Sequence, residues 1–286
     1  MTQTAIRHRV GTAKSEDGQE TRTVLAVALR KPLLWQVVIC GAVLAIWQWG
    51  PSIPGIRRGI VWADPFFISS PERCANEIGR LVVGTANTPA IWAPLGRTVF
   101  AALGGTAAAV LLGGIFGLLC SHWELLNQIS RPLLTLLNAI PKITVIPIIV
   151  LIAASSAVSD SIVAFIIVFF VIFYNACEGG SSVPKEMLQL ASLLGARSAS
   201  IMLKIRGPFV LVWTLSQIPN AIAFGLTGTV TAELFTGSNG IGGILIAAIN
   251  TQDADLTFAV VFILAAVGVV LVLGLDMVRR RVLHWW

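Results

Sequence analysis

Six apolar blocks, each close to twenty residues long, divide this chain of 286 residues. A helix needs about twenty apolar residues to cross the hydrocarbon core of a bilayer. Only 12% of the residues are charged, against about 25% in soluble domains, so the chain lacks the polar surface of a soluble protein. The blocks predict an all-α membrane protein with six transmembrane helices. The expected spans are Leu33–Trp49, Thr98–Cys120, Leu133–Ala153, Ser161–Cys177, Phe209–Ala232 and Leu256–Val278.

The distribution of Lys and Arg predicts the orientation of these spans. Cytoplasmic loops of membrane proteins carry an excess of both residues. If both termini are cytoplasmic, the inner segments hold most of the twenty Lys and Arg residues, and the outer loops 154–160 and 236–255 hold none. We therefore expect a multi-pass protein with cytoplasmic N- and C-termini. The same bias accounts for the net charge of +6, so no nucleic-acid partner is expected.

Three regions follow from this arrangement. Residues 1–30 form a polar cytoplasmic arm that is expected to lie close to the lipid surface. Residues 31–97 contain the first transmembrane helix and a long outer segment. In that segment Ser70 and Pro71 are the typical start of a short helix, whose apolar positions would let it lie on the membrane surface. Residues 98–282 form the core of the protein.

The second span contains a G-x-x-x-G pattern, formed by Gly113 and Gly117. Glycines four apart lie on one face of a helix and allow another helix to approach closely. The simpler partner is another helix of the same chain. The alternative is a seam between two copies of the protein.

The third span carries two polar residues, Asn138 and Lys142, which lie four apart and share a face. A lysine at membrane depth is costly unless it faces a watery cavity or a partner. One interpretation is that Lys142 lines a solute path, where its charge favours an anion. The other is a structural role, in which the lysine reaches the membrane surface or pairs with a carboxylate such as Glu178.

The fifth span has the most polar face. Its four polar residues fall in one narrow arc at 100° per residue: Gln217, Asn220, Thr227 and Thr231. The adjoining arc holds small residues such as Gly225, which predict close helix packing. The polar arc indicates either a translocation pathway, which Glu233 would extend, or hydrogen bonds between helices. The Gly-rich segment 237–243 predicts a turn or a short re-entrant segment.

The sequence gives little support to an enzyme. Neither the phosphate-binding pattern G-x-x-x-x-G-K-[ST] nor the zinc-binding pattern H-E-x-x-H occurs. The histidines are His8, His122 and His284, all near expected cytoplasmic ends, so none is available at membrane depth to activate a serine. The four cysteines lack metal-ligand spacing. We predict a protein that is not an enzyme and has no metal site or cofactor of its own.

A long charged segment, residues 183–208 (the polar loop), separates the fourth and fifth spans on the predicted cytoplasmic side. Pro184 and Glu186 are typical of a helix N-terminus. An apolar stripe follows at helical spacing: Met187, Leu190, Ala191 and Leu194. Gly195 is expected to end this helix, and Pro208 to close a second short one. The loop is either a linker on the membrane surface or a contact site for a cytoplasmic partner.

The polar loop resembles the E-A-A-x-x-x-G-x9-I-x-L-P motif of ABC importer permease subunits. The spacing matches in full, and four positions are identical: Ala191, Gly195, Ile205 and Pro208. Gln189, Leu190 and Gly207 replace the acid, an alanine and the leucine. Further stretches are similar to the nitrate/sulfonate/taurine branch of the family: Ser69–Pro71, Asn138–Pro141 with Pro147, and Ala232–Leu234 followed by Gly240–Gly242. The resemblance covers about residues 65–280.

This resemblance implies a MetI-like type I ABC importer permease fold in the bacterial inner membrane, with a cytoplasmic coupling-helix loop. The permease would work with a second copy of itself, a periplasmic solute-binding protein and a cytoplasmic ATPase dimer, which would bind ATP and Mg²⁺. The polar loop would dock in a groove of the ATPase. The residues expected at that contact are Glu186, Gln189, Leu190, Ala191, Leu194, Gly195, Ala196 and Arg197.

The resemblance also implies that the pair of permeases forms the solute pathway. The residues expected to line it are Asn138, Lys142, Gln217, Asn220, Thr227, Thr231 and Glu233. The family branch, together with Lys142, favours a small organic or inorganic anion of the sulfonate, taurine, nitrate or aromatic acid type. The alternative function is a six-helix secondary transporter or channel that needs no ATPase.

Overall fold

The computed structural model describes residues 35–50, 68–84, 90–153 and 156–282. All regular secondary structure in these ranges is helical. Four helical segments in these ranges are long and apolar enough to cross a membrane. Two bent helix pairs raise the number of candidate spans to six if each pair counts as one span. The four single spans are α5 (Trp92–His122), Val158–Ser181 within α8 (Ser156–Ser181), Ser198–Ser216 and Ala254–Met277 within α14 (Ala254–Val282). The predicted all-α membrane protein is confirmed.

The described residues before Cys74, 35–50 and 68–73, belong to a unit separate from the rest of the chain. Its helix Trp35–Trp49 is apolar and corresponds to the first predicted span. The indole N–H of Trp47 donates to the carbonyl of Ile68 at 3.1 Å, which ties this helix to the residues just before the helix that begins at Pro71. The predicted N-terminal arm, residues 1–30, lies outside the described residues.

The predicted short outer helix is present as α4 (Pro71–Val83). We expected the apolar side of this helix to lie on the membrane surface, but it packs against other helices of the chain. Leu81 is buried in a core cluster that also contains Ile91, Ile241 and Val260. These residues belong to the start of α5 and to α13 and α14, so protein rather than lipid covers this side of α4.

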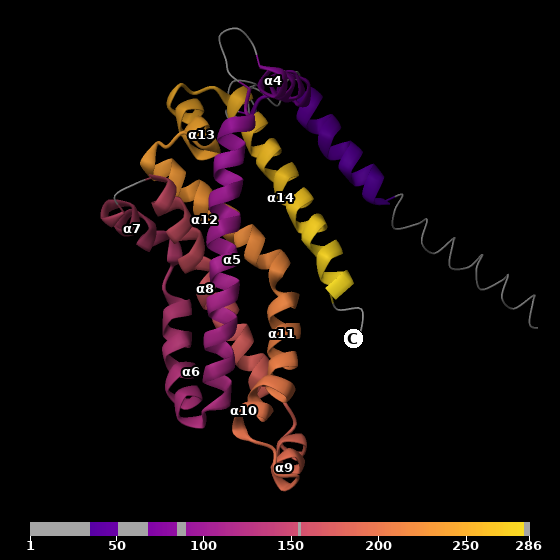
Figure 1. The fold of residues 1–286 in the computed structure, drawn as a ribbon. Coiled ribbons are helices and arrows are strands. Elements are labelled where there is room, and N and C mark those ends of the chain that lie inside the picture. Colours follow the sequence, from indigo (N-terminus) through magenta and orange to yellow (C-terminus); the bar gives the residue numbers. More distant parts are fainter. Residues whose placement is uncertain (1–34, 51–67, 85–89, 154–155, 283–286) are drawn as a thin grey trace, which may run out of the picture. The chain divides into compact units, whose positions relative to one another are not determined.

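The second unit, residues 74–286, is built around the pair α5 and α8 (Figure 1). Glycines of α5 allow the two helices to approach closely. A Cβ atom added to Gly113 would lie 3.0 Å from Ile172, and one added to Gly117 would collide with Ala176. The G-x-x-x-G pattern is therefore used for packing within the chain, the simpler of its two interpretations.

The third predicted span is a broken helix. It consists of α6 (Glu124–Ala139), a 3₁₀ turn η3 (Lys142–Val145) and α7 (Ile146–Ile152), bent by 83°. Pro141 lies at the break, where it is extended with φ −62° and ψ 104°. Proline lacks the N–H that would continue the helical ladder, so the chain turns at this residue.

The fifth predicted span, Phe209–Ala232, is wrong as a single helix. It is divided at Gln217 into α11 (Gly207–Ser216) and α12 (Ile218–Thr236). Pro219 stands in the first turn of α12, where no N–H is needed. Since proline in a helix interior costs a hydrogen bond, the chain places a new helix start there instead.

The C-terminal end of α12 leads into a second bend. Gly237 has a positive φ of 59° at the C-cap of α12, and α13 (Ile241–Asn250) leaves at 52° to it. The Gly-rich segment thus forms a turn followed by a short helix, within the alternatives that its sequence left open.

Candidate functional site

The first half of the polar loop is a short helix with a well-formed end. Helix α9 (Lys185–Leu193) starts after Pro184 and has Glu186 in its first turn. At its C-terminus the N–H of Gly195 donates to Ser192, and the N–H of Ala196 to Ala191, both at 3.0 Å. This is a Schellman motif, and Gly195 takes the left-handed conformation it requires, with φ +75°. The predicted end of the helix at Gly195 is confirmed.

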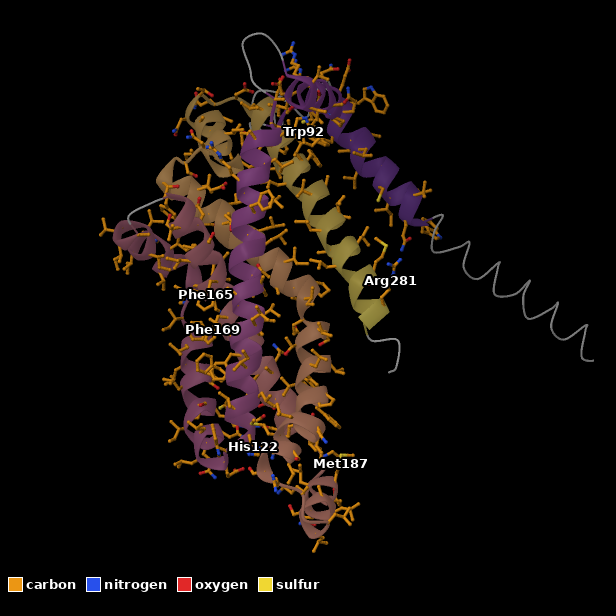
Figure 2. All side chains as sticks on the ribbon, in the orientation of Figure 1. Trp92, His122, Phe165, Phe169, Met187 and Arg281 are labelled. Carbon is orange, nitrogen blue, oxygen red and sulfur yellow. The ribbon has the colours of Figure 1, made fainter. Side chains whose placement is uncertain are left out.

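Helix α9 presents its apolar side chains to the outside. Leu190, Leu193 and Leu194 are 59%, 85% and 79% exposed. Figure 1 shows α9 projecting at the end of the bundle opposite α13, and Figure 2 shows Met187 at this tip. Of the eight residues predicted to contact an ATPase, seven are exposed and Ala191 is half-buried. The structure thus gathers them on one protruding element.

The second half of the polar loop differs from the expected separate helix. Helix α10 (Ser198–Ser200) runs through a π-helical turn η4 (Ile201–Arg206) directly into α11. Pro208 therefore does not close the segment. The widened π turn before it accommodates the missing N–H of the proline, so the helix continues.

Two contacts fix this second half to the bundle. Nε2 of His122, at the end of α5, lies 2.7 Å from the hydroxyl of Ser198. Arg206 donates from Nη1 to the carbonyl of Gly180 on α8 at 2.6 Å. Figure 2 shows His122 at the same end of the bundle as Met187. Sequence reasoning missed both contacts, because they join positions far apart in the chain.

The polar arc of α12 is open, and the adjoining arc of small residues is packed. Thr227 and Asn220 are exposed, whereas Ala221, Gly225 and Gly228 are buried. A Cβ atom added to Gly228 would lie 2.9 Å from Ile167. The predicted division of this helix into two faces is confirmed from Asn220 onward; Gln217 stands at the break before α12.

The polar side chains of this arc satisfy one another or their own helix. Thr227 and Thr231 donate their hydroxyls to the carbonyls of residues four earlier, at 2.8 and 2.6 Å. Asn220 donates to the side-chain oxygen of Gln217 at 3.1 Å. Hydrogen bonds from this arc to other helices, the alternative explanation of its polarity, are therefore not seen in the described part of the chain.

Glu233 has a different position from the rest of the arc. It is 1% exposed, and its Oε1 accepts the hydroxyl of Thr98 on α5 at 2.7 Å. Its Oε2 accepts the N–H of Gly242 at 2.7 Å, while Thr98 accepts the N–H of Ile241 at 2.9 Å. Both acceptors lie at the N-terminus of α13, where a helix favours negative charge. Glu233 thus joins α5, α12 and α13.

The two remaining pathway candidates lie at the break of the third span. Lys142 opens the turn η3 and is half-buried, and Asn138 belongs to the last turn of α6. Glu178, the carboxylate considered as a partner for Lys142, pairs instead with Arg131 at 3.0 Å. The structure therefore does not support an ion pair with Glu178 as the explanation for Lys142.

Sequence reasoning also missed a pair of charged residues at the other end of the bundle. Asp160 at the start of α8 is 4% exposed, and Arg97 near the start of α5 lines the same cavity. The sequence feature that could have indicated this pair is Asp160, a single carboxylate at the edge of a strongly apolar block. The prediction assigned Asp160 to a loop because it started the fourth span at Ser161.

The family model and the individual proteins that resemble this chain indicate the same family. The chain matches the binding-protein-dependent transport system inner membrane component family over residues 109–284, more than half of its length. It is 26% identical over 254 residues to the riboflavin transport system permease protein of Chloroflexus aurantiacus, covering 89% of this chain and 91% of that one.

Two further relatives are similar over most of their length. A probable ABC transporter permease protein of Haemophilus influenzae is 24% identical over 257 residues, covering 90% of this chain and 98% of that one. The taurine transport system permease protein of Escherichia coli is 22% identical over 223 residues, covering 78% and 81%. The relatives' names differ in solute but agree in the kind of protein. With its helical membrane core and this match, the chain belongs to the family of binding-protein-dependent inner membrane permeases and is the permease subunit of an ABC importer.

Proposed function

We propose that α9 and the turn at Gly195 form the contact through which an ATPase drives this permease. The observation that carries the proposal is the exposed apolar face of α9, since Leu190, Leu193 and Leu194 each leave more than half of their surface exposed. Exposed apolar patches of this kind are typical of interaction sites. Membership in the family implies an ATPase and a binding protein as partners, and the permease itself catalyses no reaction.

The contacts behind α9 support a direct mechanical connection. The second half of the loop is held to α5 through His122 and to α8 through Arg206. A displacement of α9 by a closing ATPase would pass through the turn at Gly195 into these two helices. The ATP-bound ATPase then favours one of two permease conformations, because the ATPase in this state binds that conformation more tightly. ATP and Mg²⁺ belong to the ATPase and not to this chain.

The proposed pathway lies along the polar arc of α12 in a pair of permeases. Its hydroxyl groups need no partner on another helix, so the arc is free to face water or a solute. The other members predicted from the sequence are Asn138 and Lys142, which belong to the break of the third span, and Glu233, which is almost completely buried at the α13 end of the arc. The solute proposed is a small anion, supported by the charge of Lys142 and by relatives named for taurine and nitrate transport.

The proposed orientation puts α9 and both termini in the cytoplasm. The solute-binding protein then delivers its solute at the opposite, periplasmic end of the bundle. The excess of Lys and Arg in the predicted inner segments supports this orientation.

The decisive experiment replaces Leu190 by Asp and measures two properties. The side chain is exposed, so the melting temperature of the purified chain should stay within about 2 °C. Association with the ATPase subunit should fall at least about tenfold, because a carboxylate would be buried against an apolar groove. Leu190→Met is the matched control and should keep both properties. Unchanged association in Leu190→Asp would contradict the proposal.

A second measurement distinguishes the proposed function from the alternative, a secondary transporter or channel that needs no ATPase. The purified chain in liposomes, without an ATPase, should show no solute uptake down a gradient. Uptake under these conditions would favour a secondary transporter or channel instead.

A further inference from the structure

A small cavity lined in part by charged and polar residues lies at the end of the bundle opposite α9. It has a volume of about 190 Å³ and lies between the start of α5, the start of α8 and the turn between α12 and α13. Its lining residues are Arg97, Ala101, Asp160, Glu233, Ser238, Asn239 and Gly240. Two carboxylates therefore line one partly open cavity at this end of the bundle.

Asp160 is the unusual member of this lining. Its side chain is 4% exposed, and its Oδ1 has no hydrogen-bond partner among the described residues. The hydroxyl oxygen of Ser238, which lines the same cavity, likewise lacks a partner there. Buried polar atoms are nearly always hydrogen-bonded, so two unpaired oxygens around one cavity indicate that the cavity has an occupant.

Glu233 does not supply the hydrogen bonds that Asp160 and Ser238 lack. Each of its oxygens accepts one hydrogen bond, from Thr98 and from Gly242. A carboxylate oxygen has two lone pairs, so each oxygen retains capacity for a second interaction. Because neither Glu233 nor Asp160 can donate when ionised, they cannot satisfy each other.

The charges of the lining point to the kind of occupant. Asp160 and Glu233 contribute two negative charges when ionised, and Arg97 contributes one positive charge. No ion pair joins Arg97 to either carboxylate in the described residues. One singly charged cation would bring the lining to neutrality, whereas a divalent cation would leave an excess positive charge.

We propose that this cavity binds one small monovalent cation, held by Asp160, Glu233 and the hydroxyl of Ser238. Oxygen atoms of this type are the ligands that hard cations prefer. The volume accommodates an ion with a few waters, given about 30 Å³ per water. Bound there, the cation bridges α8 to the α12–α13 turn, which fixes the outer ends of these helices. The proposed site shares no residue with the polar loop.

The simplest rival occupant is water alone. Water would supply hydrogen bonds to Asp160 and Ser238 without neutralising charge. A proton on Asp160 would likewise remove the need for a cation. Both alternatives predict a protein that does not distinguish small cations from large ones.

The test uses the purified full-length chain in nanodiscs of neutral lipid. Its melting temperature is measured in NaCl, KCl and N-methylglucamine chloride at equal ionic strength. A bound ion stabilises the folded state by mass action, so a tenfold excess over the dissociation constant should raise the melting temperature by about 3 °C. The rise should saturate with Na⁺ or K⁺ and be absent with N-methylglucamine, which is too large for the site. Equal melting temperatures in the three salts would overturn the proposal.

Three variants assign the effect to this cavity. Asp160→Asn should abolish the response to small cations, and Arg97→Gln should shift it to lower concentrations and add a response to Mg²⁺. Asp253→Asn is the matched control, because an Asn can still cap α14 through the contact that Asp253 makes with Leu256. It should respond as the original chain does. A response that persists in Asp160→Asn would place the ion elsewhere and overturn the assignment.

A direct measurement covers the case in which Asp160→Asn fails to fold. Binding of ²²Na⁺ and ⁸⁶Rb⁺ to the unmodified chain should saturate near one ion per chain, and Ser238→Ala should weaken it several-fold. Absence of saturable binding of both ions would overturn the proposal.

Discussion

The hydroxyl of Thr98 on α5 donates to the carboxylate of Glu233 on α12 across 2.7 Å, although the two residues are 135 positions apart. The same hydroxyl oxygen accepts the N–H of Ile241 at the start of α13 at 2.9 Å. One threonine therefore joins three helices, and both residues are almost completely buried. This contact holds together the ends of α5, α12 and α13 at the end of the bundle opposite α9.

Thr98→Val should destabilise the protein strongly. The change keeps the shape of the side chain but leaves a buried carboxylate oxygen and the N–H of Ile241 without a partner. We expect a loss of about 2–4 kcal/mol in the free energy of unfolding, measured by denaturation in detergent. Thr135→Val is the matched control, since Thr135 is exposed and donates only to its own helix. Equal losses in both variants would contradict the assigned role.

Gly104 and Gly105 should respond to alanine in opposite ways. A Cβ atom on Gly105 would lie 2.8 Å from Ala164 and collide with the backbone carbonyl of Ser161, whereas one on Gly104 meets nothing within 4 Å. Gly105→Ala should lower stability by about 1–3 kcal/mol through overpacking. Gly104→Ala should be neutral or stabilising by up to about 1 kcal/mol. Melting of the two purified variants checks the prediction, and the same sign in both would argue against the packing of α5 on α8.

Substitutions at Gly195 should uncouple ATP hydrolysis from transport in a graded way. No atom lies within 4 Å of a Cβ atom added there, so only its φ of +75° disfavours a side chain. The left-handed conformation costs about 1–2 kcal/mol for most residues and less for Asn. Gly195→Asn should keep coupling, Gly195→Ala should reduce it, and Gly195→Pro should abolish it because the N–H to Ser192 is also lost.

The measurement for the Gly195 series is the amount of solute transported per ATP hydrolysed by the reconstituted complex. Full coupling in Gly195→Pro would mean that the polar loop is only a linker.

Lys142→Ala should lower transport while leaving assembly intact. If the ammonium group contacts an anionic solute, its loss should reduce uptake by about tenfold or more, the equivalent of one charge-assisted hydrogen bond. Lys142→Arg is the control, because it keeps the charge. Uptake of the solute held by the partner binding protein is compared with the amount of complex recovered. Normal uptake in Lys142→Ala would remove the main reason for expecting an anion.

The sequence alone determined the features that depend on local pattern. The length and spacing of the apolar blocks predicted a helical membrane protein, since each block must satisfy its own backbone hydrogen bonds in lipid. The end of α9 at Gly195 was predictable because a glycine after an amphipathic stripe favours a left-handed cap. The packed and polar faces of α12 followed from helical periodicity, which needs no knowledge of neighbouring helices.

Only the tertiary structure decided how far the chain bends and which polar residues meet. The breaks at Pro141 and Gln217 fall inside the predicted third and fifth spans, and the mean hydropathy of a span does not distinguish a straight helix from a bent one. The sequence placed Glu233 in the polar arc, but the hydroxyl of Thr98 and the start of α13 enclose it. Asp160 became noticeable only when α5, α8 and the α12–α13 turn were seen to share a cavity. Burial depends on residues distant in the chain, so periodicity identifies the face of a helix and the fold decides what covers it.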